Sequence, residues 1–304
     1  MIKTTIIGLG KVGYLYDDNK IYKKISHFSS IKNNKNFRIV SVVEINKKIV
    51  NSFRKKNLHP IYDNAIEALN NHPTDLLVIA CELKFRIIKK IIESANIKYI
   101  LAEKPFKITK KNFDILLKLL KKKKIFFSVN FQRNFSDNYI NLFKKIKKGL
   151  IGPNLKCYCY FNKNFHTNAS HLLNLILLLN KKFISLRKFN NNCVNIRFRK
   201  LDTYFFNVSK IYNYNSITIF GSKGKIEISS RPEFAKLYLP INDVDYNEIK
   251  ILKLNKKLKL YDKFPQDNVL KNITQTIKFK RKPSLNIEHL TKYFKIMYNI
   301  KDYL

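Results

Sequence analysis

The sequence predicts an α/β domain with a doubly wound parallel sheet, followed by an α+β domain with a mostly antiparallel, open-faced sheet. Its 304 residues exceed the usual size of a single hydrophobic core. Short apolar runs alternate with amphipathic helical segments up to about residue 128, which is typical of βαβ units. Beyond that point long runs of strand type dominate. We therefore assign residues 1–128 to the first domain and residues 129–304 to the second.

The first strand is expected at residues 2–7, a β-branched run, and a glycine turn follows it directly. The turn consists of Gly8, Leu9, Gly10, Lys11, Val12 and Gly13. Its first glycine allows a tight turn, the second a close approach of the backbone to a pyrophosphate, and the third close packing of helix and strand. Backbone N–H groups at the helix start, those of Lys11 and Val12 included, would hold the phosphates. The sequence therefore predicts a dinucleotide-binding Rossmann domain.

The second strand is expected at residues 37–43, later than usual, so residues 14–36 contain an insertion. His27 lies in this insertion and is a candidate for the mouth of the active site. The second strand ends on Glu44, where an acid can accept a hydrogen bond from the ribose 2′-OH and repel a 2′-phosphate. We therefore expect NAD as the cofactor rather than NADP. The alternative for Glu44 is an exposed acid at a helix cap.

The other elements follow from periodicity and turn residues. In the first domain we expect helices at 46–56, 64–70, 84–95 and 109–123. Further strands are expected at 60–62, 76–80, 99–102 and 125–129, of which 76–80 has the continuous apolar pattern of a central parallel strand. In the second domain we expect strands at 155–161, 184–190, 193–199, 203–212 and 215–220, with helices near 138–148, 169–180 and 286–300.

The net charge of +39 could indicate a nucleic-acid or membrane partner. The lysines are spread along the whole chain, however, and accompany an excess of Ile, Asn, Phe and Tyr, the residues of AT-rich codons. We therefore expect neither nucleic-acid nor membrane binding. The spacing of the 4 cysteines fits neither a redox motif nor a zinc site, so we expect reduced thiols and no metal. With no apolar span and no secretory signal, we expect a cytoplasmic protein.

Eight motifs in a fixed order give the chain a family resemblance. They are GLGKVG at 8–13, SVVE at 41–44, LLVIA at 76–80, AEKP at 102–105, VNFQRNF at 129–135, IKKGLIGP at 146–153, ASHLLNL at 169–175 and FGSKGKIEI at 220–228. On these motifs the chain resembles the Gfo/Idh/MocA oxidoreductases, named for glucose-fructose oxidoreductase and inositol dehydrogenase. The combination is far more specific than any single motif.

The resemblance implies an NAD-dependent oxidoreductase that acts on a CH–OH group of a sugar, cyclitol or nucleotide-sugar, with a possible place in surface polysaccharide biosynthesis. It implies that Lys104 of the EKP motif hydrogen-bonds the reacting part of the substrate and that His171 is the acid/base. The residue types suit that chemistry, since imidazole titrates near neutral pH and an ammonium stabilises alkoxide character. It further implies a homo-oligomer, either a dimer or a tetramer.

Further site residues are expected around these two. Ala80, Cys81, Glu103 and Lys104 are expected beside the cofactor. Arg133 matches a family arginine and could meet an anionic substrate group, with a structural salt bridge as the alternative. His166 and Asn168 could supply substrate hydrogen bonds.

The chain also departs from the family pattern. Thr167 and Asn174 stand where many members carry aspartates, and residues 81–84 replace the usual loop after the fourth strand. Two alternatives therefore stay open: an NAD(H)-binding Rossmann protein with impaired catalysis, and, more remotely, a polyanion-binding protein.

Overall fold

The structure, a computed structural model, describes residues 1–18, 24–153, 155–190, 192–209, 214–230, 233–246 and 248–301. The chain forms two compact units. The first comprises Met1–Gln132 and Phe264–Leu290, and the second comprises Arg133–Lys263 and Thr291–Leu304. The predicted domain boundary lies after residue 128, whereas the chain leaves the first unit after Gln132 and also returns to it at Phe264.

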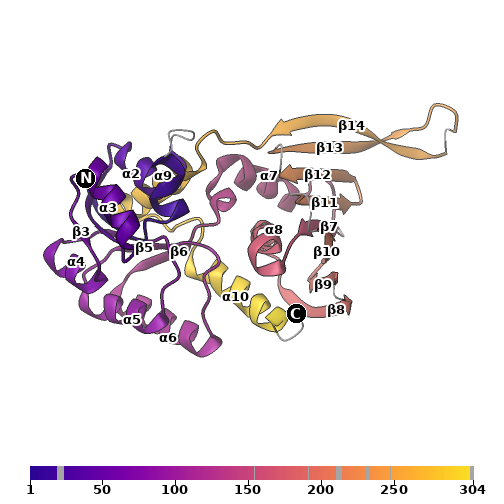
Figure 1. Ribbon diagram of the computed structural model, residues 1–304. Helices are drawn as coiled ribbons and strands as arrows, with labels where there is room; N and C mark the ends of the chain where they lie inside the picture. Colours follow the sequence, from indigo (N-terminus) through magenta and orange to yellow (C-terminus); the bar gives the residue numbers. More distant parts are fainter. Residues whose placement is uncertain are drawn as a thin grey trace. The chain divides into compact units, whose positions relative to one another are not determined.

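A six-stranded parallel sheet forms the centre of the first unit (Figure 1). Its strands are β1 (Ile2–Ile7), β2 (Phe37–Val43), β3 (Ile61–Tyr62), β4 (Leu76–Ile79), β5 (Tyr99–Ala102) and β6 (Phe126–Val129). Their order is β3-β2-β1-β4-β5-β6, which is the Rossmann order. The strand order reverses between β1 and β4, and in such sheets ligands bind beyond the carboxyl ends of the strands at this point. The predicted doubly wound parallel sheet is confirmed.

The helical segments of the first unit are η1 (Lys11–Leu15), α1 (Tyr16–Asp18), α2 (His27–Lys32), α3 (Lys47–Lys56), α4 (Ala65–Asn71), α5 (Phe85–Ser94), α6 (Lys110–Lys123) and α9 (Pro265–Phe279). Two of them begin at asparagine caps, because Asn46 accepts from the first turn of α3 and Asn64 from that of α4. The inserted α2 packs on β2 and α9. Its Phe28 meets Tyr14 and Phe53 edge to face, with ring centroids 5.3 and 5.1 Å apart.

An eight-stranded sheet forms the second unit. Its strands are β7 (Leu155–Asn162), β8 (Phe183–Asn190), β9 (Cys193–Phe198), β10 (Leu201–Ser209), β11 (Ser216–Gly221), β12 (Gly224–Ser230), β13 (Glu233–Asn242) and β14 (Lys250–Lys259). They lie in the order β14-β13-β12-β11-β7-β10-β9-β8, and among the described residues of this sheet only the β7–β10 pair is parallel. The predicted, mostly antiparallel sheet is confirmed. The sequence-based strand at 203–212 extends into residues 210–212, which lie outside the described residues.

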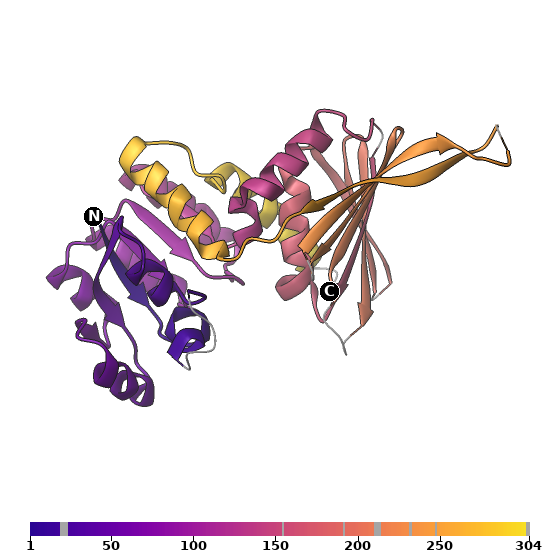
Figure 2. The same cartoon turned by 90° about the horizontal axis from the view of Figure 1, so that it is seen from above.

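Helices cover one face of this second sheet, as Figure 2 shows for α7 (Asp137–Lys147), α8 (Ser170–Ile176) and the C-terminal part of α10 (Ile287–Lys301). The short helices are η2 (Gln132–Phe135), η3 (Phe165–Ala169) and η4 (Leu177–Leu179). Burial alternates along β7, where Cys157 and Cys159 are buried while Tyr158 and Tyr160 are half-buried. The half-buried side chains therefore lie on the face opposite the helices.

The sequence prediction did not include the strands β12, β13 and β14 or the helix α9. Almost every residue of β14 is exposed, so burial does not impose an alternation of apolar and polar residues on its sequence. Its conformation comes from pairing with β13 along the whole strand. The start of α9 has a recognisable signal, Pro265 at the first turn followed by Asp267.

Candidate functional site

The three glycines of the turn differ in their surroundings: Gly8 and Gly13 are needed for packing, whereas Gly10 faces open space. Gly8 has φ +89°, and a Cβ there would lie 2.7 Å from the Cβ of Cys81. A Cβ on Gly13 would overlap the carbonyl oxygen of Gly8, so the helix lies directly against the end of β1. Gly10 differs from both, because a Cβ there would meet no atom within 4 Å. The turn therefore leaves open space at the position where a pyrophosphate approaches the backbone.

A cavity of about 850 Å³ lies at the carboxyl ends of the parallel strands, within the first unit. Its lining includes Gly8, Gly10, Glu44, Asn46, Asn64, Ala80 and Cys81. Residues of the β2–α3, β3–α4 and β4–α5 connections thus line one space, the crevice predicted from the strand order. Helix η1 begins at Lys11, and the first N–H groups of a helix, here those of Lys11 and Val12, have no partner within the helix. The volume, the open side of Gly10 and these N–H donors fit a dinucleotide.

Glu44 links the end of β2 to the glycine turn. Its carboxylate accepts from Leu9 N at 2.7 Å and from Ile45 N and Asn46 N, both at 2.9 Å. Because three backbone donors hold the carboxylate, a negative charge is fixed at the rim of the cavity. Glu44 is therefore not a simple exposed helix cap. Its contact with a ribose remains a prediction.

Cys81 packs against the glycine turn from the β4–α5 connection. Burial, followed by the charge of Glu44, raises the pKa of its thiol to about 11. The thiol is therefore protonated at neutral pH and is a poor nucleophile. Its place in the cavity supports a packing role beside Gly8.

Glu103 and Lys104 form the turn after β5, and the peptide bond between Lys104 and Pro105 is cis. Both residues are half-buried. The Glu103 carboxylate accepts from His27 Nε2 at 2.8 Å, from Asn130 Nδ2 at 2.5 Å and from Lys104 N at 3.2 Å. Burial raises the pKa of Glu103, but the hydrogen bonds from His27 and Asn130 outweigh burial and hold it below its usual value. Glu103 is thus an ionised, nearly enclosed carboxylate beside Lys104.

His27, Asn130 and Gln266 form a polar cluster that the sequence analysis did not identify. His27 was a candidate for the mouth of the site, but it is 2% exposed and bonded on both ring nitrogens. Asn130 lies within the VNFQRNF motif, where only its position after a strand marked it. Gln266 could not be found because α9 was not predicted.

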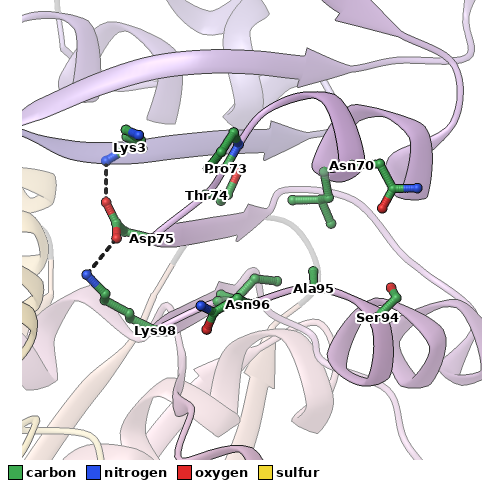
Figure 3. Close-up of a pocket in the computed structure, with 11 residues that line it drawn as sticks. Lys3, Asn70, Pro73, Thr74, Asp75, Ser94, Ala95, Asn96 and Lys98 are labelled. Atoms are coloured by element: carbon green, nitrogen blue, oxygen red, sulfur yellow. Dashed lines mark hydrogen bonds and ion pairs between the residues drawn. The ribbon is translucent and has the colours of Figure 1, made fainter.

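The opposite edge of the sheet holds a smaller cavity of about 450 Å³ (Figure 3). There Asp75 accepts from Lys3 N at 2.9 Å and pairs with Lys98 Nζ at 2.8 Å. Burial raises the pKa of Asp75, but the bonds from Lys98 and Lys3 N outweigh burial and lower it. This carboxylate ties the amino ends of neighbouring strands together, so we assign it to stability.

The second unit holds the other predicted residues. Arg133 Nε and Nη2 donate to Glu233 Oε1 at 3.0 and 2.7 Å, so the structural salt bridge expected as the alternative is present. Substrate binding by Arg133 remains a prediction.

The motif around His171 begins with η3 and continues into α8. Asn164 Oδ1 caps η3 and also accepts from the Thr167 hydroxyl at 2.8 Å. Asn168 donates to Asn162 Oδ1 at 2.6 Å. His166 is exposed and His171 half-buried, one on each side of the η3–α8 junction. The structure thus places both histidines and Asn168 in one helical segment of the second unit.

The described residues also bear on membrane and metal sites. No helix among them is both long and apolar enough to span a bilayer. Nor do they contain a cluster of three or more His, Cys, Asp or Glu side chains suited to a metal ion.

Comparison with known proteins gives a family match for the first unit. Residues 2–131 match the model of an oxidoreductase family with an NAD-binding Rossmann fold. None of the curated proteins matches the sequence.

Solved structures share the fold at low sequence identity. A putative oxidoreductase, YvaA, from Bacillus subtilis is 14% identical, with 98% of this chain and 96% of that chain covered at a TM-score of 0.73. Myo-inositol 2-dehydrogenase from Lactobacillus plantarum is 13% identical (97% and 94% covered, TM-score 0.72). UDP-N-acetylglucosamine 3-dehydrogenase from Acidithiobacillus ferrooxidans is 13% identical (97% and 96% covered, TM-score 0.69). Such identities establish the fold alone.

Proposed function

We propose that the chain is an NAD-dependent dehydrogenase or reductase of the Gfo/Idh/MocA oxidoreductase family, whose NAD-binding Rossmann model matches residues 2–131. The observation that carries the proposal is the open side of Gly10, which faces no atom within 4 Å and lies on a cavity of about 850 Å³. A pyrophosphate needs this freedom of approach. The fixed charge of Glu44 on the same cavity supports NAD over NADP, because it repels a 2′-phosphate.

We propose a CH–OH group of a sugar, cyclitol or nucleotide-sugar as the reacting group. A dehydrogenase of myo-inositol and one of UDP-N-acetylglucosamine share the fold, which supports this range. When bound, NAD supplies the hydride acceptor or donor. His171 would take the hydroxyl proton or return it, and Lys104 would donate to the substrate oxygen and stabilise its negative charge. A role in surface polysaccharide biosynthesis belongs to the same proposal.

Titration of the protein with NADH and NADPH in a thermal-shift assay tests cofactor binding. NADH should raise the midpoint of unfolding at lower concentration than NADPH, because a ligand stabilises the native state in proportion to ln(1 + [L]/Kd). No shift with either nucleotide at about 1 mM would refute the proposal, since it would place both Kd values above the usual range. Turnover is then measured on a panel of sugars, cyclitols and nucleotide-sugars.

A binding protein without turnover is the second candidate, and the surroundings of His171 favour it. The Thr167 hydroxyl is directed to Asn164, and the buried Asn174 amide donates to Ser170 O at 2.9 Å. Neither position offers the carboxylate that many family members carry there. Retained NADH binding without turnover on the whole panel would support this candidate. DNA binding that survives about 0.2 M salt would instead support a polyanion-binding function.

We also propose that the chain forms a homo-oligomer through the open face of its second sheet. Stacked rings line this face: Tyr158 lies 5.7 Å from Tyr204, and Tyr160 lies 5.5 Å from Phe206 between ring centroids. Rows of half-buried aromatic side chains are typical of interface cores. A dimer or tetramer in light scattering would support the proposal, and a monomer at micromolar concentration would contradict it.

A further inference from the structure

Four side chains form a closed ring of hydrogen bonds around the turn after β5. Asn130 Nδ2 donates to Glu103 Oε1 at 2.5 Å and to Gln266 Oε1 at 3.3 Å. Gln266 Nε2 lies 2.6 Å from His27 Nδ1, and His27 Nε2 lies 2.8 Å from Glu103 Oε1. His27 and Gln266 are each 2% exposed and Asn130 is 3% exposed. Buried polar side chains contribute specificity when every member of the network has its partner.

The charge of Glu103 decides the direction of every bond in this ring. An ionised carboxylate only accepts, so the Asn130 atom beside it must be the amide nitrogen. The same nitrogen donates to Gln266, which must therefore present its oxygen to Asn130 and its nitrogen to His27. His27 Nδ1 then accepts from Gln266 Nε2, and His27 Nε2 donates to Glu103. In this arrangement every donor of the ring faces an acceptor.

Gln132 adds one further contact to the ring, whereas the Asn130 oxygen takes no part in it. Gln132 Nε2 donates to Gln266 Oε1 at 2.9 Å, which again requires an oxygen at that position. The Asn130 oxygen, directed away from the ring, has no hydrogen-bond partner among the residues that the structure describes. With both ring nitrogens engaged, His27 has no nitrogen left for a substrate proton.

The ring also connects the turn to both chain crossings, that is, to the segment that leaves the first unit after Gln132 and to the segment that returns to it at Phe264. Asn130 stands directly after β6, two residues before Gln132, the last residue of the first unit before the chain leaves it. Gln266 is the third residue after the chain returns to the first unit at Phe264. Glu103 is joined to both through the ring, and its second oxygen accepts from Lys104 N at 3.2 Å.

We propose that His27 and Gln266 are positioning residues that hold the Glu103–Lys104 turn in place relative to the two chain crossings. The inference rests on the proposed function in one respect, since Lys104 is there the group that meets the substrate. Loss of the ring frees the turn from β6 and α9 without removing any group that meets substrate. The expected consequence is a fall in kcat with little change in the Kd for NADH.

Lysine footprinting tests the proposal without any need for turnover. Lys104 is labelled with acetic anhydride, and its rate is compared by mass spectrometry with that of Lys107, an exposed lysine of the same connection. In His27→Leu and Gln266→Leu the ratio of the Lys104 rate to the Lys107 rate should rise at least about fivefold, because local opening exposes the turn. Gln275→Leu, the same substitution elsewhere on α9, should leave the ratio within about twofold of the wild-type value.

Two variants guard against loss of the fold. His27→Gln keeps a donor toward Glu103 and should retain most of the wild-type ratio. Gln266→Asn keeps the amide but is one methylene too short for the ring, so it should behave like Gln266→Leu at a smaller cost in packing. An unchanged Lys104 ratio in folded Gln266→Asn, or equal ratios in His27→Gln and His27→Leu, would overturn the proposal.

The titration with NADH distinguishes failure of the ring proposal from failure of the proposed function. Long-range ¹H–¹⁵N spectra of histidine-labelled protein, assigned by the signal lost in His27→Gln, should show His27 with its proton on Nε2. A proton on Nδ1 would refute the ring even if NADH binds and turnover is normal. Conversely, a protein that binds no NADH can still show the predicted tautomer and footprint, in which case only the proposed function fails.

Discussion

Replacement of Gly10 by alanine should separate cofactor binding from folding. Gly10 has φ −62° and ψ −162°, which L-residues adopt freely, and a methyl group there would meet no atom of the protein within 4 Å. Such a Gly→Ala change stabilises the native state by about 0.4–1 kcal/mol, because the unfolded chain loses conformational freedom. At about 2–4 °C per kcal/mol, the midpoint of unfolding should rise by roughly 1–4 °C.

The same methyl group occupies the space that a pyrophosphate needs. If it displaces one charge-assisted hydrogen bond to the phosphates, the loss is about 1.5–3 kcal/mol. That loss corresponds to a Kd for NADH weakened by roughly tenfold to a hundredfold. Fluorescence titration with NADH measures it, and thermal unfolding without ligand measures the stability.

Gly13→Ala is the matched control, since a Cβ there would overlap the Gly8 carbonyl oxygen. We expect this variant to unfold at a lower temperature than the wild type. Wild-type NADH affinity in a folded Gly10→Ala protein would refute the assignment of the glycine turn. A large loss of stability in Gly10→Ala would contradict the open space found beside it.

Four other outcomes are expected. Glu44→Gln should change the ratio of NADPH to NADH affinity by about tenfold in favour of NADPH, because the fixed negative charge is lost; an unchanged ratio in titrations would contradict this. Lys104→Ala and His171→Ala should each abolish turnover and leave the NADH Kd within about threefold of wild type, whereas near-full activity would exclude that role. Asp75→Asn should cost about 1 kcal/mol at pH 7 in urea unfolding. Because the folded pKa of Asp75 lies below its unfolded value near 3.9, this difference should shrink as the pH falls through the folded pKa; a constant difference would exclude the pairing. Phe206→Lys should lower the mass in light scattering if the open sheet face is the interface, and an unchanged oligomer would place the interface elsewhere.

The parallel sheet and its glycine turn could be predicted because they depend on local patterns. The continuous apolar run of β4 indicates a strand buried on both faces, and its predicted bounds of 76–80 differ by one residue from the observed Leu76–Ile79. Gly8 and Gly13 mark a turn that only glycine allows, the first by its positive φ and the second by its contact with the Gly8 oxygen. Propensity and periodicity act within a few residues, so the chain displays them directly.

The exposed hairpin escaped prediction for the converse reason. β14 lies almost wholly in solvent, so burial selects no alternation along its lysine-rich sequence. Its pairing with β13 is decided by backbone hydrogen bonds, which carry little sequence signal.

The sequence by itself determined the Rossmann domain, the place of the glycine turn and the acid at the end of β2. Only the tertiary structure decided what surrounds the Glu103–Lys104 turn. His27 and Gln266 are 239 residues apart, yet they are hydrogen-bonded, and Arg133 meets Glu233 across 100 residues. No local pattern encodes such pairs, because their geometry follows from how whole helices and strands pack. The hydrogen-bonding needs of a buried carboxylate then select an arrangement in which every donor faces an acceptor.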